Sequence, residues 1–258
     1  IFLVFNTADY GHKINNINFS HNISLDQMAK SGDALERDTI LEPKSSSDEE
    51  NLSKWLMRYK SYSVEADEHI VIMALARINP SELQFDPGFY IYGGSFLYPL
   101  GLFYFGLEKL GVINISSFDN MLSNPDIFDD IYYYGRLFII FFVALSAVLL
   151  FLMCRRIVSL NTSLIYTAIF LLMPATIMFS QIIKPHYYAL FWSNLALFYL
   201  IKSFSNNKIG WLNGIIIGAS IGMCVGASLI YSVFAVFVWM SILVYKKFTD
   251  RLKFLVIK

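Results

Sequence analysis

The 258-residue chain is 56% hydrophobic and only 16% charged, with a formal net charge of +0 and a mean hydropathy of +0.51. A soluble domain has roughly 45–50% apolar and about 25% charged residues, so this composition excludes an ordinary soluble enzyme and indicates an integral membrane protein. The balanced charge does not indicate a nucleic-acid partner. Both cysteines, Cys154 and Cys224, lie in or beside apolar tracts, so no disulfide framework is predicted.

The two ends of the chain are apolar. Residues 1–5 are typical of the end of a hydrophobic segment, and the chain stops within the apolar stretch 254–258. The first residue is not Met. We therefore expect a fragment that begins inside its first transmembrane helix and stops before its natural end.

An acidic pair, Asp67 and Glu68, precedes a short apolar helix that the sequence predicts over 70–78. The positive end of a helix dipole favours carboxylates at this position. Neighbouring residues on a helix point in different directions, so the two carboxylates are not expected to have the same role. The alternative is that Asp67 only caps the helix, since Asp is a common N-cap residue.

The tract Pro87–Leu107 is uncharged and long enough to cross a membrane, but it is rich in Gly, Pro and Tyr. Tyrosine prefers the headgroup region of a bilayer. Glycine and proline lower helix propensity by about 1 and about 3 kcal/mol relative to alanine. We therefore expect short helical pieces in the membrane interface, broken near Gly93-Gly94 and near Pro99–Gly101.

The rest of the chain consists of apolar tracts separated by short loops. A helix needs ~20 residues to cross ~30 Å of hydrocarbon, which predicts five transmembrane helices after residue 134. If Pro87–Leu107 does not cross, most basic residues of the later loops lie on one side, which the positive-inside rule assigns to the cytoplasm. The predicted helices lie at about 137–154, 163–182, 186–203, 211–226 and 229–245.

Taken in order, these features resemble the GT-C superfamily of membrane glycosyltransferases, and especially the aminoarabinose transferase and protein O-mannosyltransferase branch. Ala66-Asp67-Glu68-His69 is similar to the acidic motif of the family's first exoplasmic loop. The segment from Arg136-Leu137 to Arg155-Arg156 is similar to its second span. The chain departs from the pattern at Lys184-Pro185-His186, where many relatives carry an acidic residue.

The resemblance implies an all-α integral membrane fold: a GT-C-like multi-span helical bundle with a large exoplasmic first loop and juxtamembrane helices. Residues 1–5 would be the remnant of the first span, 6–134 the exoplasmic loop and 135–258 the bundle. The implied activity is that of an inverting hexosyl- or pentosyltransferase. It would move a sugar from a polyprenyl-phosphate donor to a lipid, glycan or protein acceptor, in the bacterial inner membrane.

For this chemistry Asp67 is the expected general base, with Glu68 as its orienting partner. Arg136 and Lys184 are candidates for stabilising the leaving phosphate, although each is also explained as a basic residue reaching the membrane interface. The other expected substrate-binding residues are Asp86, Tyr90 and His186.

One of these assignments has a further alternative. Asp86 precedes Pro87, and its position is better explained by a turn. His69 and His186 lack a second ligand at metal spacing, so neither a metal nor another cofactor is predicted.

The alternative function is that of a transporter or channel-type membrane protein with an extracytoplasmic domain. Such a protein is expected to carry an ionisable residue inside a span, whereas the predicted spans have uncharged apolar cores. A non-catalytic scaffold or sensor is a third alternative. Against this alternative, the polar region of the chain is small and continues directly into apolar segments expected at the membrane interface.

Overall fold

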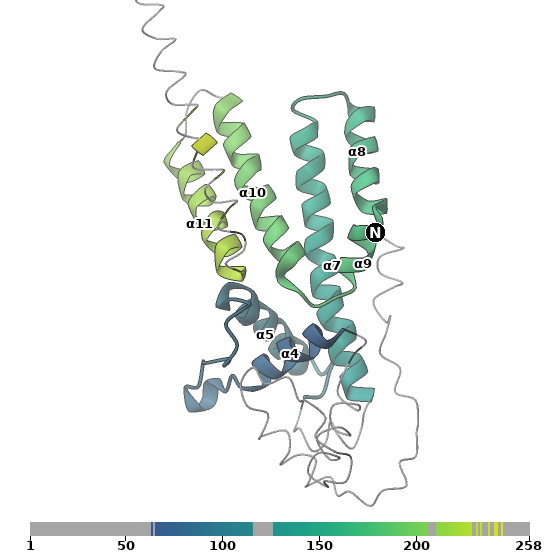
Figure 1. The fold of residues 1–258 in the computed structure, drawn as a ribbon, viewed down its shortest axis with the longest axis vertical. Helices are drawn as coiled ribbons and strands as arrows, with labels where there is room; N and C mark the ends of the chain where they lie inside the picture. The colour runs from purple at the N-terminus through teal and green to yellow at the C-terminus, as the bar shows by residue number, and fades with distance from the viewer. Residues whose placement is uncertain are drawn as a thin grey trace, which may run out of the picture. The chain divides into compact units, whose positions relative to one another are not determined.

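A computed structural model of the chain describes residues 63, 65–115, 126–205 and 210–228, and a few single residues from 231 to 244. The expected remnant 1–5, the loop 6–62 and most of the span expected at 229–245 lie outside these residues. The described part forms helices and no strand (Figure 1). Its elements are α4 (Ala66–Ala76), the 3-10 turn η1 (Pro80–Glu82), α5 (Gly94–Lys109), α7 (Asp126–Cys154), α8 (Leu160–Leu172), α9 (Pro174–Ser180), α10 (Pro185–Ser205) and α11 (Trp211–Ala227).

The chain divides into two compact units. Unit 1 contains α4, η1, α9, most of α5 and the first half of α7; unit 2 contains α8, α10, α11 and the second half of α7. Their ranges are 1–90, 97–141 and 173–184 for unit 1, and 91–96, 142–172 and 185–258 for unit 2.

Among the described residues, only α7 is by itself long and apolar enough to cross a membrane, over Ile127–Cys154. α8 and α9 reach that length only together, because Met173 separates them and Pro174 begins the second helix. Proline has no N–H to continue a helix but fits its first position. α7, α8–α9, α10 and α11 cover most of the first four predicted spans, and their crossing of a membrane stays a prediction.

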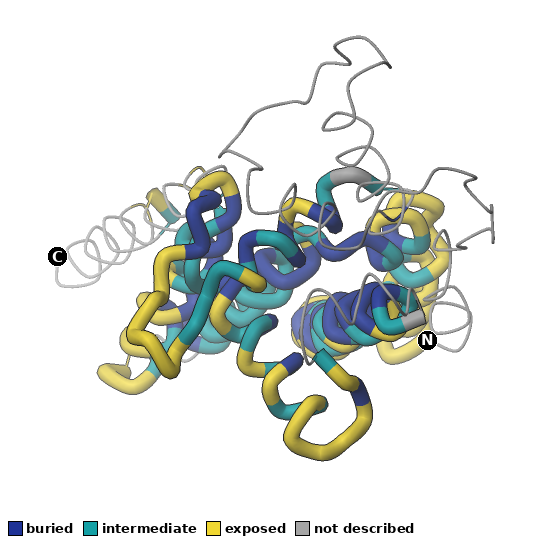
Figure 2. The backbone as a smooth tube through the Cα atoms, turned by 90° about the horizontal axis from the view of Figure 1, so that it is seen from below, coloured by how far each residue is buried: buried dark blue, intermediate teal, exposed yellow. Residues whose placement is uncertain are grey.

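Burial differs strongly between these helices (Figure 2). α7 buries a series of side chains that includes Ile139, Ile140 and Val143. α8 buries only Ser163 among its residues, although the helix is apolar. An apolar helix that exposes most of its side chains is expected where the surrounding medium is lipid.

The acidic pair lies in the first turn of α4. The residue before the helix is Glu65, whose backbone is extended and whose side chain forms no cap hydrogen bond. The alternative that Asp67 caps the helix is therefore wrong, because Asp67 is already the second residue of α4.

α5 corrects part of the prediction for the Gly-, Pro- and Tyr-rich tract. The helix begins at Gly94, close to the first predicted break, but it continues through Pro99 to Lys109. The second predicted break is wrong. Phe96, Leu97 and Leu100 around the proline are fully buried, and burying each contributes about 1.5–3 kcal/mol, which together exceeds the proline penalty of about 3 kcal/mol.

In unit 2, α10 packs against α11 through a cluster built around Leu200 and Ile217. The segment that leads into α5 joins the end of α11. The N–H of Gly93 donates to the carbonyl of Ala227 at 2.8 Å. A Cβ at Gly93 would lie 1.8 Å from the carbonyl oxygen of Gly226, so glycine is required for this approach.

In unit 1, Gly135 on α7 allows two other segments to approach the helix. A Cβ there would lie 2.2 Å from the hydroxyl of Tyr104 and 2.5 Å from Cδ1 of Ile183. The Tyr104 hydroxyl donates to the carbonyl of Ile131 at 2.8 Å. Burial raises the pKa of Tyr104 well above its usual value, with a further rise from the Glu68 carboxylate, so this hydroxyl remains a neutral donor.

Gly135→Ala is expected to destabilise the protein, because an added Cβ overlaps Tyr104 and Ile183 and overpacking costs about 1–3 kcal/mol. Gly106→Ala is the matched control on α5, since a Cβ there meets nothing within 4 Å. Alanine should stabilise that helix by up to about 1 kcal/mol. Melting temperatures in detergent measure both effects, and equal stability of the two variants would contradict the Gly135 contact.

Candidate active site

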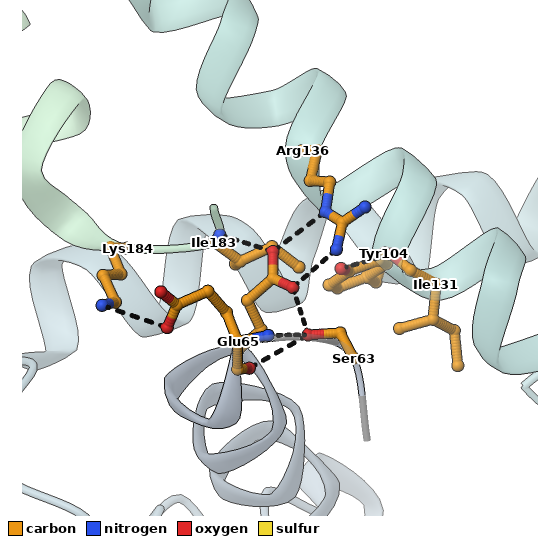
Figure 3. Close-up of polar contacts among 8 residues, drawn as sticks. Ser63, Glu65, Tyr104, Ile131, Arg136, Ile183 and Lys184 are labelled. Carbon is orange, nitrogen blue, oxygen red and sulfur yellow. Dashed lines mark hydrogen bonds and ion pairs between the residues drawn. The ribbon is translucent and has the colours of Figure 1, made fainter. Parts of the chain in front are cut away.

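The carboxylate of Glu68 is fully buried and accepts hydrogen bonds from three other segments. Arg136 on α7 donates from Nε to Oε1 at 3.0 Å and from Nη2 to Oε2 at 2.7 Å. The backbone N–H of Ile183 donates to Oε1 at 2.9 Å, and the Ser63 hydroxyl donates to Oε2. Figure 3 shows Arg136, Ile183 and Ser63 converging on this carboxylate from different parts of the chain.

This ion pair is buried on both sides, with Glu68 0% and Arg136 2% exposed. Removing charges from water costs several kcal/mol per ion, which only good geometry and additional hydrogen bonds offset. The two parallel Arg–carboxylate bonds and the Ser63 and Ile183 donors meet that requirement. The pair therefore fixes α4 against α7 and against the segment that follows α9.

Asp67, the neighbouring acid, has a different environment. Its side chain is 45% exposed, and its Oδ2 lies 2.7 Å from Nζ of Lys184. The same Nζ lies 3.6 Å from Oε2 of Glu65, whose side chain is 44% exposed. Figure 3 shows Lys184 directed at Glu65. One largely buried lysine thus contacts two solvent-accessible carboxylates.

The two acids contact consecutive residues of one segment. Glu68 accepts from the N–H of Ile183, and Asp67 pairs with Lys184. Because the Glu68 contact is buried and has several donors, it sets the position from which Lys184 reaches Asp67. The arrangement presents a carboxylate that can accept a proton beside an ammonium that can contact an anion.

Asp86 and Tyr90 lie in the turn that follows η1. Oδ1 of Asp86 accepts from the N–H of Gly88 at 2.8 Å and from the hydroxyl of Tyr90 at 2.7 Å. This is the side-chain-to-backbone bond of an Asx turn, as the turn alternative for Asp86 predicts. His186 belongs to unit 2, where its Nδ1 lies 2.8 Å from the hydroxyl of Tyr231.

Of the predicted site residues, the structure brings together Asp67, Glu68, Arg136 and Lys184. Their roles in catalysis and binding, and those of Asp86, Tyr90 and His186, stay predictions. Within the described part of the chain, no group of three His, Cys, Asp or Glu residues could hold a metal ion.

Sequence reasoning missed three members of this cluster: Ser63, Glu65 and the N–H of Ile183. Ile183 acts through its backbone, which leaves no signal in residue type. Ser63 and Glu65 precede α4 outside any helix, where no periodicity marks an inward-facing position. Only the acidic character of Glu65, two residues before Asp67, could have singled it out.

Replacing Arg136 with Met is expected to destabilise the protein by about 3–5 kcal/mol, since it leaves the buried Glu68 carboxylate without its counter-ion. Asp67→Asn is the comparison, because an exposed ion pair contributes only about 1 kcal/mol or less. Thermal unfolding in detergent should therefore separate the two variants clearly. Indistinguishable melting curves would show that the Glu68–Arg136 pair is not structural.

Comparison with known proteins identifies one family. The family model described as dolichyl-phosphate-mannose-protein mannosyltransferase matches residues 111–257, more than half of the chain. The matched range contains Arg136 and Lys184 and begins after Asp67 and Glu68. No curated protein and no solved structure matches the chain. The family match confirms the GT-C resemblance predicted from the sequence.

Proposed function

Because the chain belongs to the dolichyl-phosphate-mannose-protein mannosyltransferase family, we propose that it is an inverting transferase with Asp67 as its general base. Membership makes it an integral membrane glycosyltransferase with a polyprenyl-phosphate-sugar donor. We further propose that it transfers a hexosyl or pentosyl group to an exoplasmic lipid, glycan or protein. Family membership favours this activity over the transporter or channel considered as the alternative.

The contact between Asp67 and Lys184 is the observation that supports the mechanism. As the acceptor hydroxyl attacks the anomeric carbon, Asp67 takes up its proton, because a positioned carboxylate can remove a weakly acidic proton late in the reaction. The new bond forms on the face opposite the phosphate, and the old carbon–oxygen bond breaks. The phosphate leaves with the bonding electrons, and the ammonium of Lys184 stabilises its charge.

In this proposal Glu68 and Arg136 position the site. Glu68 holds the N–H of Ile183 and, through it, the neighbouring Lys184. The guanidinium of Arg136 makes two hydrogen bonds to Glu68 inside the protein. Its buried position favours a role in orienting Glu68 over the predicted contact with phosphate, and Lys184 is then the phosphate-binding cation.

The same contact supports the proposed topology. Asp67 and Lys184 touch, so they lie on the same side of the membrane. Three segments lie between them in the chain: α5, α7 and the α8–α9 pair. If α7 and the α8–α9 pair each cross the membrane once, the chain has returned to its starting side, so α5 does not cross. Residues 6–134 are then exoplasmic, and Arg155 and Arg156 are cytoplasmic, as the positive-inside rule predicts. We propose the bacterial inner membrane as the location.

The topology can be tested by labelling single cysteines with a membrane-impermeant reagent in intact cells, in a background that lacks Cys154 and Cys224. Ser117→Cys is expected to react, because it lies in the proposed exoplasmic region. Asn206→Cys is expected to react only after the cells are opened. The reverse pattern would refute the proposed arrangement.

Asp67→Asn should lower turnover by roughly 10²- to 10⁴-fold, the usual contribution of a positioned base, and leave the melting temperature nearly unchanged. The assay uses detergent-solubilised full-length protein with labelled polyprenyl-phosphate sugars. Glu82→Gln, on the exposed turn η1, removes a carboxylate outside the site and should keep wild-type turnover.

Glu68→Gln should lower turnover less than Asp67→Asn does, because the proposed role of Glu68 is orientation. Near-normal turnover of the Asp67→Asn variant would refute the proposed role of Asp67 as the general base.

A further inference from the structure

We propose that Glu65 is a positioning residue that shares Lys184 with Asp67, so that the donor phosphate must take Lys184 over from both carboxylates. This inference rests on the proposed function and adds a residue and an order of events to it. Donor binding would release Asp67 from its ion pair, and only then would Asp67 accept the proton of the acceptor.

The first observation is the geometry around the ammonium. Nζ of Lys184 lies 2.7 Å from Asp67 and 3.6 Å from Glu65, and the lysine side chain is only 15% exposed. Both carboxylates are nearly half exposed. The cation is therefore less accessible to solvent than the two carboxylates that neutralise it.

The second observation is that Glu65 is anchored. Its backbone N–H donates to Oγ of Ser63 at 3.2 Å, and the Ser63 hydroxyl contacts the buried Glu68 carboxylate. Its carbonyl also accepts from the N–H of Glu68 at 3.1 Å. Glu65 is thus connected to the same buried ion pair that positions Lys184, so its carboxylate is held near the ammonium.

Charge counting then gives the order of events. Among the described residues, one ammonium between two carboxylates gives these three side chains a net charge of about −1, which repels an anionic donor at short range. The donor phosphate can bind despite this repulsion if it replaces the carboxylates as the partner of Lys184. The ammonium is then paired with an anion both before and after the exchange. Asp67 loses its cation in the same step and becomes available to the acceptor hydroxyl.

Glu65→Gln is the informative variant because it keeps the size of the side chain and removes its charge. With one carboxylate fewer, the site repels phosphate less, so the KM for the donor should fall by roughly two- to fivefold, the effect of one exposed charge. In the donor-bound state the phosphate holds Lys184 in wild type and variant alike, so kcat should stay close to the wild-type value. A purely structural role of Glu65 would lower the melting temperature without this selective decrease in KM.

The experiment uses full-length protein in detergent and two measurements. One is donor kinetics; the other is direct binding of unlabelled polyprenyl phosphate, which carries the phosphate but no sugar. Glu65→Gln should bind it more tightly than wild type, with a difference that shrinks at high ionic strength because salt screens exposed charges. Glu65→Asp, which keeps the charge, should stay close to wild type, and Glu82→Gln is the control for loss of a carboxylate elsewhere.

Lys184→Gln separates the proposed interaction from other effects of Glu65. Donor affinity should fall in this variant, and adding Glu65→Gln to it should raise affinity less than the same change does in wild type, because the competition for the shared cation is gone and only charge repulsion remains. Unchanged phosphate affinity in Glu65→Gln, or an equal change with and without Lys184, would overturn the inference. Absence of sugar transfer by wild-type protein would instead refute the proposed function, because phosphate binding is measured independently of transfer.

Discussion

The buried ion pair between Glu68 and Arg136 is the interaction on which unit 1 depends. It joins a residue of α4 to a residue of α7 that lies far along the chain. The Glu68 carboxylate also accepts hydrogen bonds from the Ser63 hydroxyl and the N–H of Ile183. A buried pair of this kind is a weak source of net stability but a strong constraint on geometry, since losing either partner leaves an uncompensated charge. Specific placement of α4 is therefore its main contribution.

The pair also explains why two adjacent acids have different properties. The same turn of α4 directs Glu68 into the protein and Asp67 towards solvent. The buried acid has fixed donors, whereas the accessible acid pairs with Lys184, whose side chain is 15% exposed. Next to Arg136, Gly135 has no side chain, and this leaves room for Tyr104 and Ile183 to pack against α7. Positioning and accessibility are thus divided between neighbouring residues.

Much of this architecture could be predicted from residue patterns, because helices and apolar tracts are local properties. The helix after the acidic pair, the break before Gly94 and the helices over four of the predicted spans were all predicted from short windows of sequence. α5 could not be predicted in full, because the penalty of Pro99 is local while the burial that offsets it comes from distant residues. For the same reason Arg136 could be identified as a candidate cation but not as the partner of Glu68.

Within the site, different directions for Asp67 and Glu68 follow from helix geometry alone, whereas the contact between Asp67 and Lys184 does not. The charge pattern could indicate only that Lys184 and the acidic motif lie on the same side of the membrane. Backbone donors such as the N–H of Ile183 leave no trace in residue type, and Glu65 lies outside any periodic segment. The residues hardest to predict are those whose role depends on tertiary contacts.

α10 begins at Pro185, directly after the lysine that contacts Asp67. Proline disfavours helical backbone in the residue before it, so α10 cannot readily grow backwards by one residue. In a chain without this proline, the lysine could become the first residue of the helix, and helix geometry would then set the direction of its side chain. Pro185 thus fixes the residue at which α10 begins, and the direction of the Lys184 side chain depends on where that helix begins.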